Sequence, residues 1–163
     1  MSRYSEPANA AIVKAFILAD PVLGPKAPLG PLNDWGFIWN ALNAPTSPAF
    51  IVWRGIVGRF ELRAAALVGA TQLDALTASK RDSLLWAISE DLDFSVAANR
   101  AAIDDLCGSQ NTLKAALVAV QKRTCTVAEK LFATGTGTIA VPATAGITGP
   151  VQIDVIGTIL STP

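Results

Sequence analysis

The chain has 163 residues, enough for one domain with a single hydrophobic core. Its 13 basic and 13 acidic residues give a formal charge of zero, which argues against a nucleic-acid binder that depends on neutralising phosphates. Hydrophobic residues make up 51% of the chain and charged residues only 16%, below the roughly 25% of an average soluble protein. No apolar run is long enough to span a membrane, so we expect an oligomer to cover much of the apolar surface.

The first part of the chain predicts helices separated by a loop rich in proline and glycine. Pro7 to Ala19 form the first predicted helix, with Ser5 as its N-cap and Asp20-Pro21 as its end. The ten residues from Val22 contain three prolines and two glycines, which predicts an ordered loop. A second helix, capped by Asn33, places apolar side chains at i, i+3, i+4 and i+7: Trp35, Ile38, Trp39 and Leu42. Paired tryptophans can stack on a base or a sugar, but no basic stripe accompanies these two, so we favour core packing.

The middle of the chain predicts one extended stretch followed by short helices. Pro45, Ser47 and Pro48 predict a turn, and Ala49 to Arg54, with the sequence AFIVWR, has the β-branched and aromatic residues typical of a strand or extended stretch. Arg54 and Arg59 are close enough to grip a phosphate, but a salt bridge with Glu61 is the commoner arrangement and the one that we favour. Helices are then expected at Phe60–Val68, Thr71–Leu76, Ser79–Ser89, Ala97–Leu106 and Thr112–Lys122.

The one acidic cluster lies between two of these helices and contains Glu90, Asp91 and Asp93. Such carboxylates can bind a divalent cation, but the twelve-residue loop of an EF-hand is missing. We therefore favour a solvated loop that leads into a helix start at Ser95.

The residues that most often carry chemistry are scarce. The chain has no histidine, and Cys107 and Cys125 lack the spacing of a zinc site, so both are expected to be small buried hydrophobes. Without histidine, the Ser-His and Cys-His nucleophile arrangements are excluded. The sequence predicts no catalytic residue, no metal and no cofactor, and we do not expect an enzyme.

The C-terminal part joins a capped helix to a long uncharged segment. Thr126 and Glu129 have the spacing of a capping box. Thr134 to Pro150 consists almost entirely of Gly, Thr, Ala, Pro and β-branched residues, and no charge occurs between Lys130 and Asp154. This composition predicts an extended or hairpin-like arm that a partner covers. Val151 to Leu160 fits a helix better than a strand.

Two stretches carry a resemblance to a known family. AEKLFATGTGT, followed by a Pro-Ala-Thr and a Gly-Pro, and SPAFIVWR near the middle resemble the signatures of small proteins encoded among the capsid and tail genes of tailed bacteriophages. The resemblance implies a structural neck protein, a head-tail adaptor that docks under the portal as a twelve-fold ring. Where that family carries aromatic and acidic residues around its Gly-Pro, this chain has only Asp154.

Together, these elements predict a mainly α fold: a small helical bundle with one short extended stretch and a C-terminal apolar arm or hairpin. We expect a helical domain at residues 1–133, and an arm with a terminal helix at 134–163 that packs on neighbours or is exchanged with them. The arm residues expected to contact a partner are Thr136, Thr138, Ile139, Val141, Pro142 and Ile147. In a ring, Glu90, Asp91 and Asp93 are candidates to face the DNA channel, where repulsion from phosphate keeps DNA sliding.

The expected function is therefore that of a head-tail adaptor or connector in the virion neck, assembled in the host cytoplasm. Its expected partners are further copies of itself, the portal protein, and a tail terminator or another neck protein, with genomic DNA passing through unbound and no membrane contact. One alternative is another neck or tail-completion subunit. The alternative from a different class is a small helical nucleic-acid-binding or regulatory module.

Overall fold

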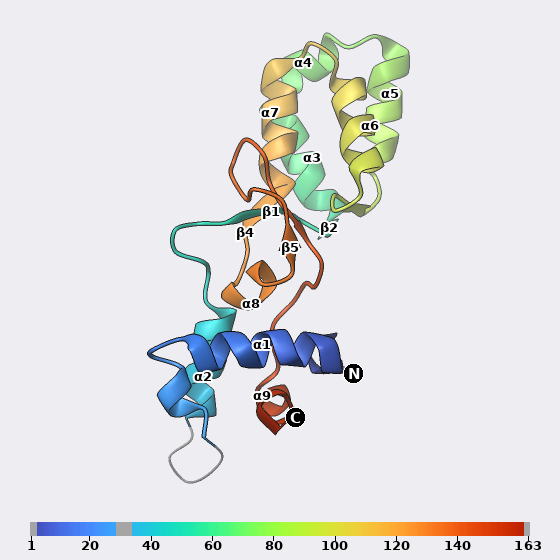
Figure 1. Ribbon diagram of the computed structural model, residues 1–163. Helices are drawn as coiled ribbons and strands as arrows, with labels where there is room; N and C mark the ends of the chain where they lie inside the picture. Colours follow the sequence, from blue (N-terminus) through green and yellow to red (C-terminus); the bar gives the residue numbers. More distant parts are fainter. Residues whose placement is uncertain (1–2, 29–33, 162–163) are drawn as a thin grey trace. The chain divides into compact units, whose positions relative to one another are not determined.

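The computed structural model describes residues 3–28 and 34–161 (Figure 1). Helices dominate these residues and the strands are two or three residues long, so the fold is mainly α, as predicted. The contacts divide the chain into two compact units. Unit 1 comprises Met1–Phe50, Thr124–Thr136 and Ala145–Pro163, and unit 2 comprises Ile51–Arg123 and Gly137–Thr144. This grouping differs from the expected division at residue 134, because the terminal helix packs with the first helices of the chain.

Unit 1 is built from short helices at both ends of the chain. Its elements are η1 (Arg3–Ser5), α1 (Pro7–Ala19), η2 (Gly24–Lys26), α2 (Trp35–Asn43), α8 (Val127–Lys130), β5 (Ala133–Thr134) and α9 (Ile153–Ser161). The predicted bounds of the first helix are confirmed. The predicted cap Asn33 lies outside the described residues, and the Asp34 side chain instead accepts a hydrogen bond from the backbone N–H of Phe37 at 2.9 Å.

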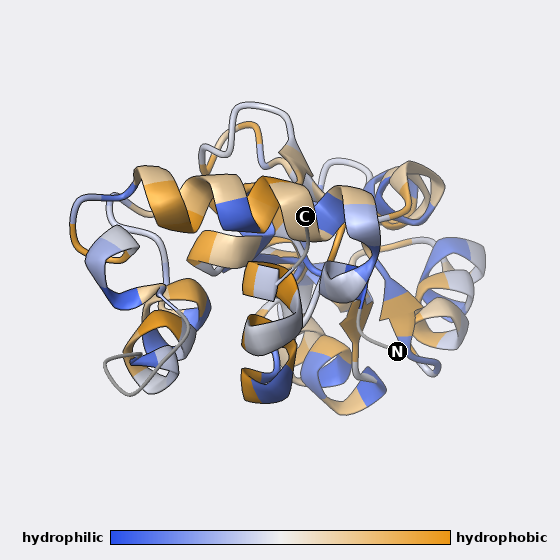
Figure 2. Ribbon diagram, turned by 60° about the horizontal axis from the view of Figure 1, so that its bottom comes forward, coloured by the Kyte–Doolittle hydropathy of each residue, from blue (hydrophilic) through white to orange (hydrophobic). Residues whose placement is uncertain are grey.

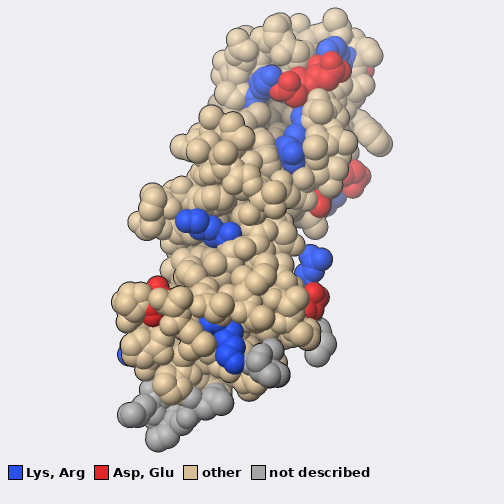
Figure 3. Space-filling model, viewed as in Figure 1, with Lys and Arg blue, Asp and Glu red and all other residues tan. Residues whose placement is uncertain are grey.

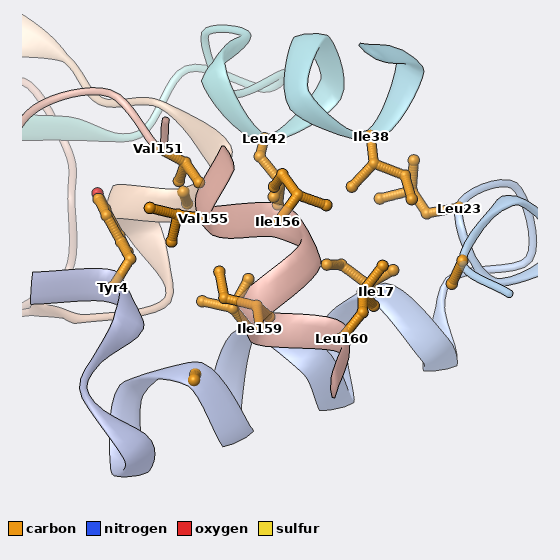
Figure 4. Packing of buried hydrophobic residues seen from close by; sticks show 14 of the residues in the cluster. Tyr4, Ile17, Leu23, Ile38, Leu42, Val151, Val155, Ile156, Ile159 and Leu160 are labelled. Carbon is orange, nitrogen blue, oxygen red and sulfur yellow. The ribbon is translucent and has the colours of Figure 1, made fainter. Parts of the chain in front are cut away.

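The core of unit 1 forms where α9 packs against α1 and α2. Figure 4 shows Ile156 of α9 beside Leu42 of α2, and Leu160 of α9 beside Ile17 of α1. The tryptophans of α2 are half-buried against this core, which confirms the interpretation that they serve packing. The indole N–H of Trp39 also donates to the Val151 carbonyl at 2.8 Å, so its polar end is satisfied.

Polar side chains hold the chain in place just before α9. Asn43 accepts a hydrogen bond from the Val151 N–H at 2.8 Å and donates to the Val151 carbonyl at 3.0 Å. Glu129, which is 2% exposed, uses one carboxylate oxygen in the predicted capping box with Thr126. Its other oxygen accepts from the Gly149 N–H at 3.0 Å. Gly149 has φ +95°, a conformation that favours glycine.

Unit 2 contains the middle helices and three short strands, and two further strands cross its boundary with unit 1. Its elements are β1 (Ile51–Trp53), β2 (Ile56–Val57), α3 (Arg59–Val68), α4 (Ala70–Asp74), α5 (Ala78–Ala87), β3 (Leu92–Asp93), α6 (Ala97–Cys107) and α7 (Asn111–Val120), with β4 (Lys122–Thr124) and β6 (Thr144–Ala145) at the boundary. The predicted helix to Lys122 is wrong at its end, because Lys122 belongs to β4, which pairs with β1. β2 and β3 are antiparallel, with Val57 opposite Leu92.

Helices α3 and α7 pack against each other in unit 2, and their backbones come close at Gly69. Of the small residues of α3, Ala65 and Ala66 are buried, whereas Ala64 is exposed. At the end of α3, a Cβ on Gly69 would lie 2.5 Å from the Cα of Leu113 in α7. The helix backbones approach each other closely here because Gly69 has no side chain.

No helix in the described ranges is both long and apolar enough to cross a membrane.

We predict that Gly69→Ala lowers the free energy of unfolding by about 1–3 kcal/mol, because the added methyl group overpacks the contact with Leu113. Gly36→Ala is the matched control, since its Cβ would meet nothing nearer than Asp34 Oδ1 at 3.8 Å inside α2. There the substitution should be neutral or stabilise by up to about 1 kcal/mol. Denaturant unfolding followed by circular dichroism measures both variants. Equal stabilities for the two variants would contradict this account of the α3–α7 contact.

Candidate partner-binding surface

The uncharged C-terminal segment folds back onto its own chain instead of extending from it. We call residues 137–144 the tip loop. At its start, the Gly137 carbonyl accepts a hydrogen bond from the Ile51 N–H at 2.7 Å. Near its end, the Ala143 N–H donates to the Ile51 carbonyl and the Ala143 carbonyl accepts from the Trp53 N–H, both at 2.9 Å. Both ends of the tip loop are therefore fixed along β1.

The turn of the tip loop is closed by its own hydrogen bonds and by a lysine. The Thr138 N–H donates to the Val141 carbonyl at 3.1 Å, and the Val141 N–H donates to the Thr138 hydroxyl at 2.9 Å. Lys122 of β4 donates from Nζ to the Ile139 carbonyl at 2.9 Å, with its ammonium 5.3 Å from the centre of the Trp53 ring. Arg100 lies over the same ring at 4.5 Å. The turn is therefore closed by hydrogen bonds within itself and by one hydrogen bond from Lys122.

The structure separates the predicted arm residues into exposed and buried sets. Ile139 and Val141 are 75% and 58% exposed at the turn, and Thr136 and Thr138 are also exposed. Pro142 is buried at the base of the loop, and Ile147 lies in the core of unit 1 at 5% exposure. The surface that the segment presents in this conformation is therefore centred on Ile139 and Val141.

Two of the three clustered acids hold backbone groups of unit 2. Asp91 accepts a hydrogen bond at 2.9 Å from the N–H of Arg59, the first residue of α3. Asp93 accepts from both the N–H and the hydroxyl of Ser95, at 2.8 and 2.6 Å. Glu90 and Asp91 are exposed and Asp93 is half-buried. Among the described residues, no group of His, Cys, Asp and Glu side chains is arranged to hold a metal ion.

The remaining polar candidates have structural partners. Arg54 forms an ion pair with Glu61 and donates to the Val120 carbonyl at 3.1 Å, which confirms the salt bridge that the sequence favoured.

Cys107 and Cys125 are free thiols and fully buried, as predicted. Burial, and to a lesser degree the charge of Asp104, raises the pKa of the Cys107 thiol. The thiol is therefore protonated and unreactive at neutral pH.

A surface that sequence reasoning missed lies on α3. Phe60, Leu67 and Val68 are 74%, 70% and 70% exposed, and their spacing of i, i+7 and i+8 places them on one side of the helix. The buried residues of α3 lie on the opposite side, toward α7. The signal was present in the sequence, because α3 has apolar residues on two faces, whereas a surface helix normally has one apolar stripe.

Beside this face lies an apolar groove, which we call the α3–α5 groove. It has a volume of about 430 Å³, and its lining residues come from α3, α4 and the end of α5: Arg63, Ala66, Leu67, Leu73, Leu85 and Ile88. On the other side of α5, Trp86 is 76% exposed and borders a second hollow of about 230 Å³ with residues of α6. Unit 2 thus presents large apolar side chains along much of α3 and α5.

Charges are sparse on the face of the molecule that Figure 3 shows. Figure 3 shows Lys, Arg, Asp and Glu in small scattered groups, with wide areas that carry neither sign. Figure 2 shows hydrophobic residues along most helices of the chain. Exposed apolar residues are normal singly, but several large ones on neighbouring helix faces mark a surface for interaction.

Comparisons with protein-family models, with curated proteins and with solved structures found no match for this chain.

We predict that aspartate substitutions separate the exposed from the buried arm residues. Ile139→Asp and Val141→Asp should change the free energy of unfolding by less than about 0.5 kcal/mol, because both side chains already contact solvent. Ile147→Asp should cost more than about 3 kcal/mol, because it places a carboxylate in the core of unit 1. Denaturant titration of the three variants measures this difference. Similar losses at positions 139 and 147 would show that the turn is not exposed in the free protein.

Proposed function

We propose that the protein is a structural virion subunit, a head-tail adaptor that assembles as a ring between the portal and the tail. The observation that carries the proposal is the exposed apolar surface of unit 2, on α3, α5 and the tip loop. Covering one large apolar side chain contributes about 1.5–3 kcal/mol. A partner that covers several of them therefore gains enough to offset much of the association cost, which is about 4–15 kcal/mol.

Among the described residues, unit 2 has more large exposed hydrophobic side chains than unit 1, so we assign the main contact surface to unit 2. They are Ile56, Phe60, Leu67, Val68, Leu85, Trp86, Val96, Ile139 and Val141, against Ile12, Leu18, Val22, Phe37 and Ile153 in unit 1. The resemblance of AEKLFATGTGT and SPAFIVWR to phage neck proteins supports the proposed role in the neck. We propose further copies of the chain and the portal protein as partners, with a tail terminator or another neck protein on the other side.

The proposal places the protein in the virion neck, after assembly in the host cytoplasm, with genomic DNA passing through the ring. The exposed acids Glu90 and Asp91 are the better candidates to face that DNA. Asp93 is half-buried and is held by its hydrogen bonds to Ser95. Another neck or tail-completion subunit would use the same apolar surface, and the partner that covers it distinguishes the two roles.

A nucleic-acid-binding or regulatory module is the alternative from another class. Against it, basic side chains of the described residues lie within 4.0 Å of a carboxylate oxygen, among them Lys26, Arg54, Lys80, Arg81 and Lys114. A cation that is already paired with a carboxylate neutralises DNA phosphates less well, so fewer counterions leave the DNA. These ion pairs weaken the case for a nucleic-acid-binding module.

The test mixes the purified chain with the portal protein from the same genome and measures the mass of the complex by light scattering. We predict a stoichiometric, ring-sized complex, and we predict that the double variant Ile139→Asp with Val141→Asp prevents it while remaining folded. The double variant Ile12→Asp with Leu18→Asp is the matched control and should assemble normally, because both residues are exposed apolar residues of unit 1.

A monomer that never joins the portal, yet is retained on DNA in low salt and released as salt rises, would contradict the adaptor and support the module. Normal rings from the double variant would instead remove the tip loop from the assembly surface.

A further inference from the structure

We propose that the α3–α5 groove binds a helix of a partner protein, and that a carboxylate of this helix pairs with Arg63. This inference rests on the proposed function, because it names the chemistry of a partner that covers the apolar surface of unit 2.

Arg63 lines the groove with an uncompensated charge. Its side chain is exposed, and within the described residues it has no ion pair, hydrogen bond or ring contact. Glu61, the one acidic residue of α3, is paired with Arg54. Arg59 lies one turn before Arg63, and like charges at this spacing repel each other. A carboxylate from another molecule would therefore stabilise Arg63.

The other lining residues make the groove apolar. Ala66 and Ile88 are buried at its floor, whereas Leu67 and Leu85 are 70% and 42% exposed. A ligand that covers these leucines removes apolar surface from water, but it also displaces water from the Arg63 guanidinium. That dehydration costs free energy unless an opposite charge replaces the water. The matching ligand is therefore apolar, with a carboxylate beside its apolar residues.

The walls of the groove favour a helix over an extended chain. Its lining residues come from α3, α4 and α5, apart from Ile88, which directly follows α5. The backbone groups inside a helix are paired with each other, so these walls offer an extended chain no backbone partners. A helical ligand satisfies its own backbone and needs only side-chain contacts. We therefore expect an amphipathic helix, with apolar residues at i, i+3, i+4 and i+7 and an Asp or Glu beside them.

The charges along α3 place the carboxylate of the ligand near Arg63 and not at the start of the helix. A second hollow, of about 530 Å³, lies at the start of α3 and is lined by Gly58, Arg59, Phe60, Glu90 and Asp91. Its two carboxylates outnumber its one guanidinium, so it repels a further acid. Acidic residues of the ligand are therefore expected opposite Arg63, and neutral or basic ones near Glu90.

A helix covers more of unit 2 than the groove alone. α3 has 10 residues, which at about 1.5 Å per residue gives a length of about 15 Å. Phe60 and Leu67 are both exposed, and their spacing of i and i+7 places them on the same side of α3. A partner helix of similar length that lies along α3 can contact both residues.

The test selects peptides of about 16 residues, long enough to form a helix, from a randomised display library against the full-length protein. Peptides that also bind the Leu67→Asp variant are discarded, so that the remaining ones depend on the groove. Leu67 is exposed, and circular dichroism verifies that the variant is folded. We expect the selected sequences to have apolar residues at helical spacing and to be enriched in Asp or Glu relative to the library.

The selected peptide that binds best is then titrated, by fluorescence anisotropy, against the unsubstituted chain and the variants Arg63→Glu and Lys130→Glu. Arg63→Glu should weaken binding by about tenfold, because its carboxylate repels that of the peptide. Lys130→Glu is the matched control, with the same change of charge at an exposed basic residue of unit 1, and should leave binding unchanged. Replacing the acidic residue of the peptide by lysine should restore binding to Arg63→Glu.

A library that yields no groove-dependent peptide, or only peptides that lack helical spacing, would overturn the proposal. Equal binding to the unsubstituted chain and to Arg63→Glu would overturn it as well. If the portal complex forms in any of these cases, the adaptor stands and only this partner chemistry is lost. Groove-dependent acidic helices without any portal complex would support the site and contradict the adaptor.

Discussion

The buried carboxylate of Glu129 is the constraint on which the C-terminal part of the chain depends. One of its oxygens accepts from the Thr126 N–H and starts α8, and the other accepts from the Gly149 N–H. Loss of the carboxylate would leave the N–H groups of Thr126 and Gly149 without this acceptor, and a buried donor without a partner costs about 1–3 kcal/mol. Asn43 then fixes the following residues through Val151, so that α9 meets α1 and α2 with its apolar side inward. The residues after Gly149 are therefore part of the core of unit 1.

Backbone hydrogen bonds at both ends fix the course of the segment between β5 and α9. Phe132 and Gly146 pair through their backbone at 3.0 Å, and Gly137 and Ala143 pair with β1. Between these contacts the chain turns at the surface and presents Ile139 and Val141, and α3 and the end of α5 present an apolar groove on the same unit. Several exposed apolar side chains on one unit are the kind of surface that a partner covers.

The sequence predicted the features that depend on local pattern. Hydrophobic periodicity predicted the helix at Pro7–Ala19 and the core tryptophans. The spacing of Thr126 and Glu129 predicted the capping box. The burial of both cysteines was expected because the chain has no histidine and no zinc-site spacing. It did not distinguish Ile139 from Ile147, since both are β-branched residues in the same uncharged stretch. Ile139 is exposed because the chain on both sides of it is hydrogen-bonded to Ile51, and Ile147 is buried close to the hydrogen bond from Gly149 to Glu129. These hydrogen bonds join residues that are far apart in the sequence. The exposed face of α3 was missed because only the bounds of this helix were predicted, and the positions of its apolar residues around the helix were not considered.

Hydroxyl-radical footprinting of the free and the assembled protein tests the central claim most directly, because it reports the solvent exposure of individual side chains. The account predicts that oxidation of Phe60, Leu67 and Ile139 falls on assembly, since unit 2 provides the interface. Leu18 and Val22, exposed on unit 1, should react as before. If the protection appears on Leu18 and Val22 while Leu67 and Ile139 remain as reactive as in the free protein, the apolar surface of unit 2 is not the assembly surface.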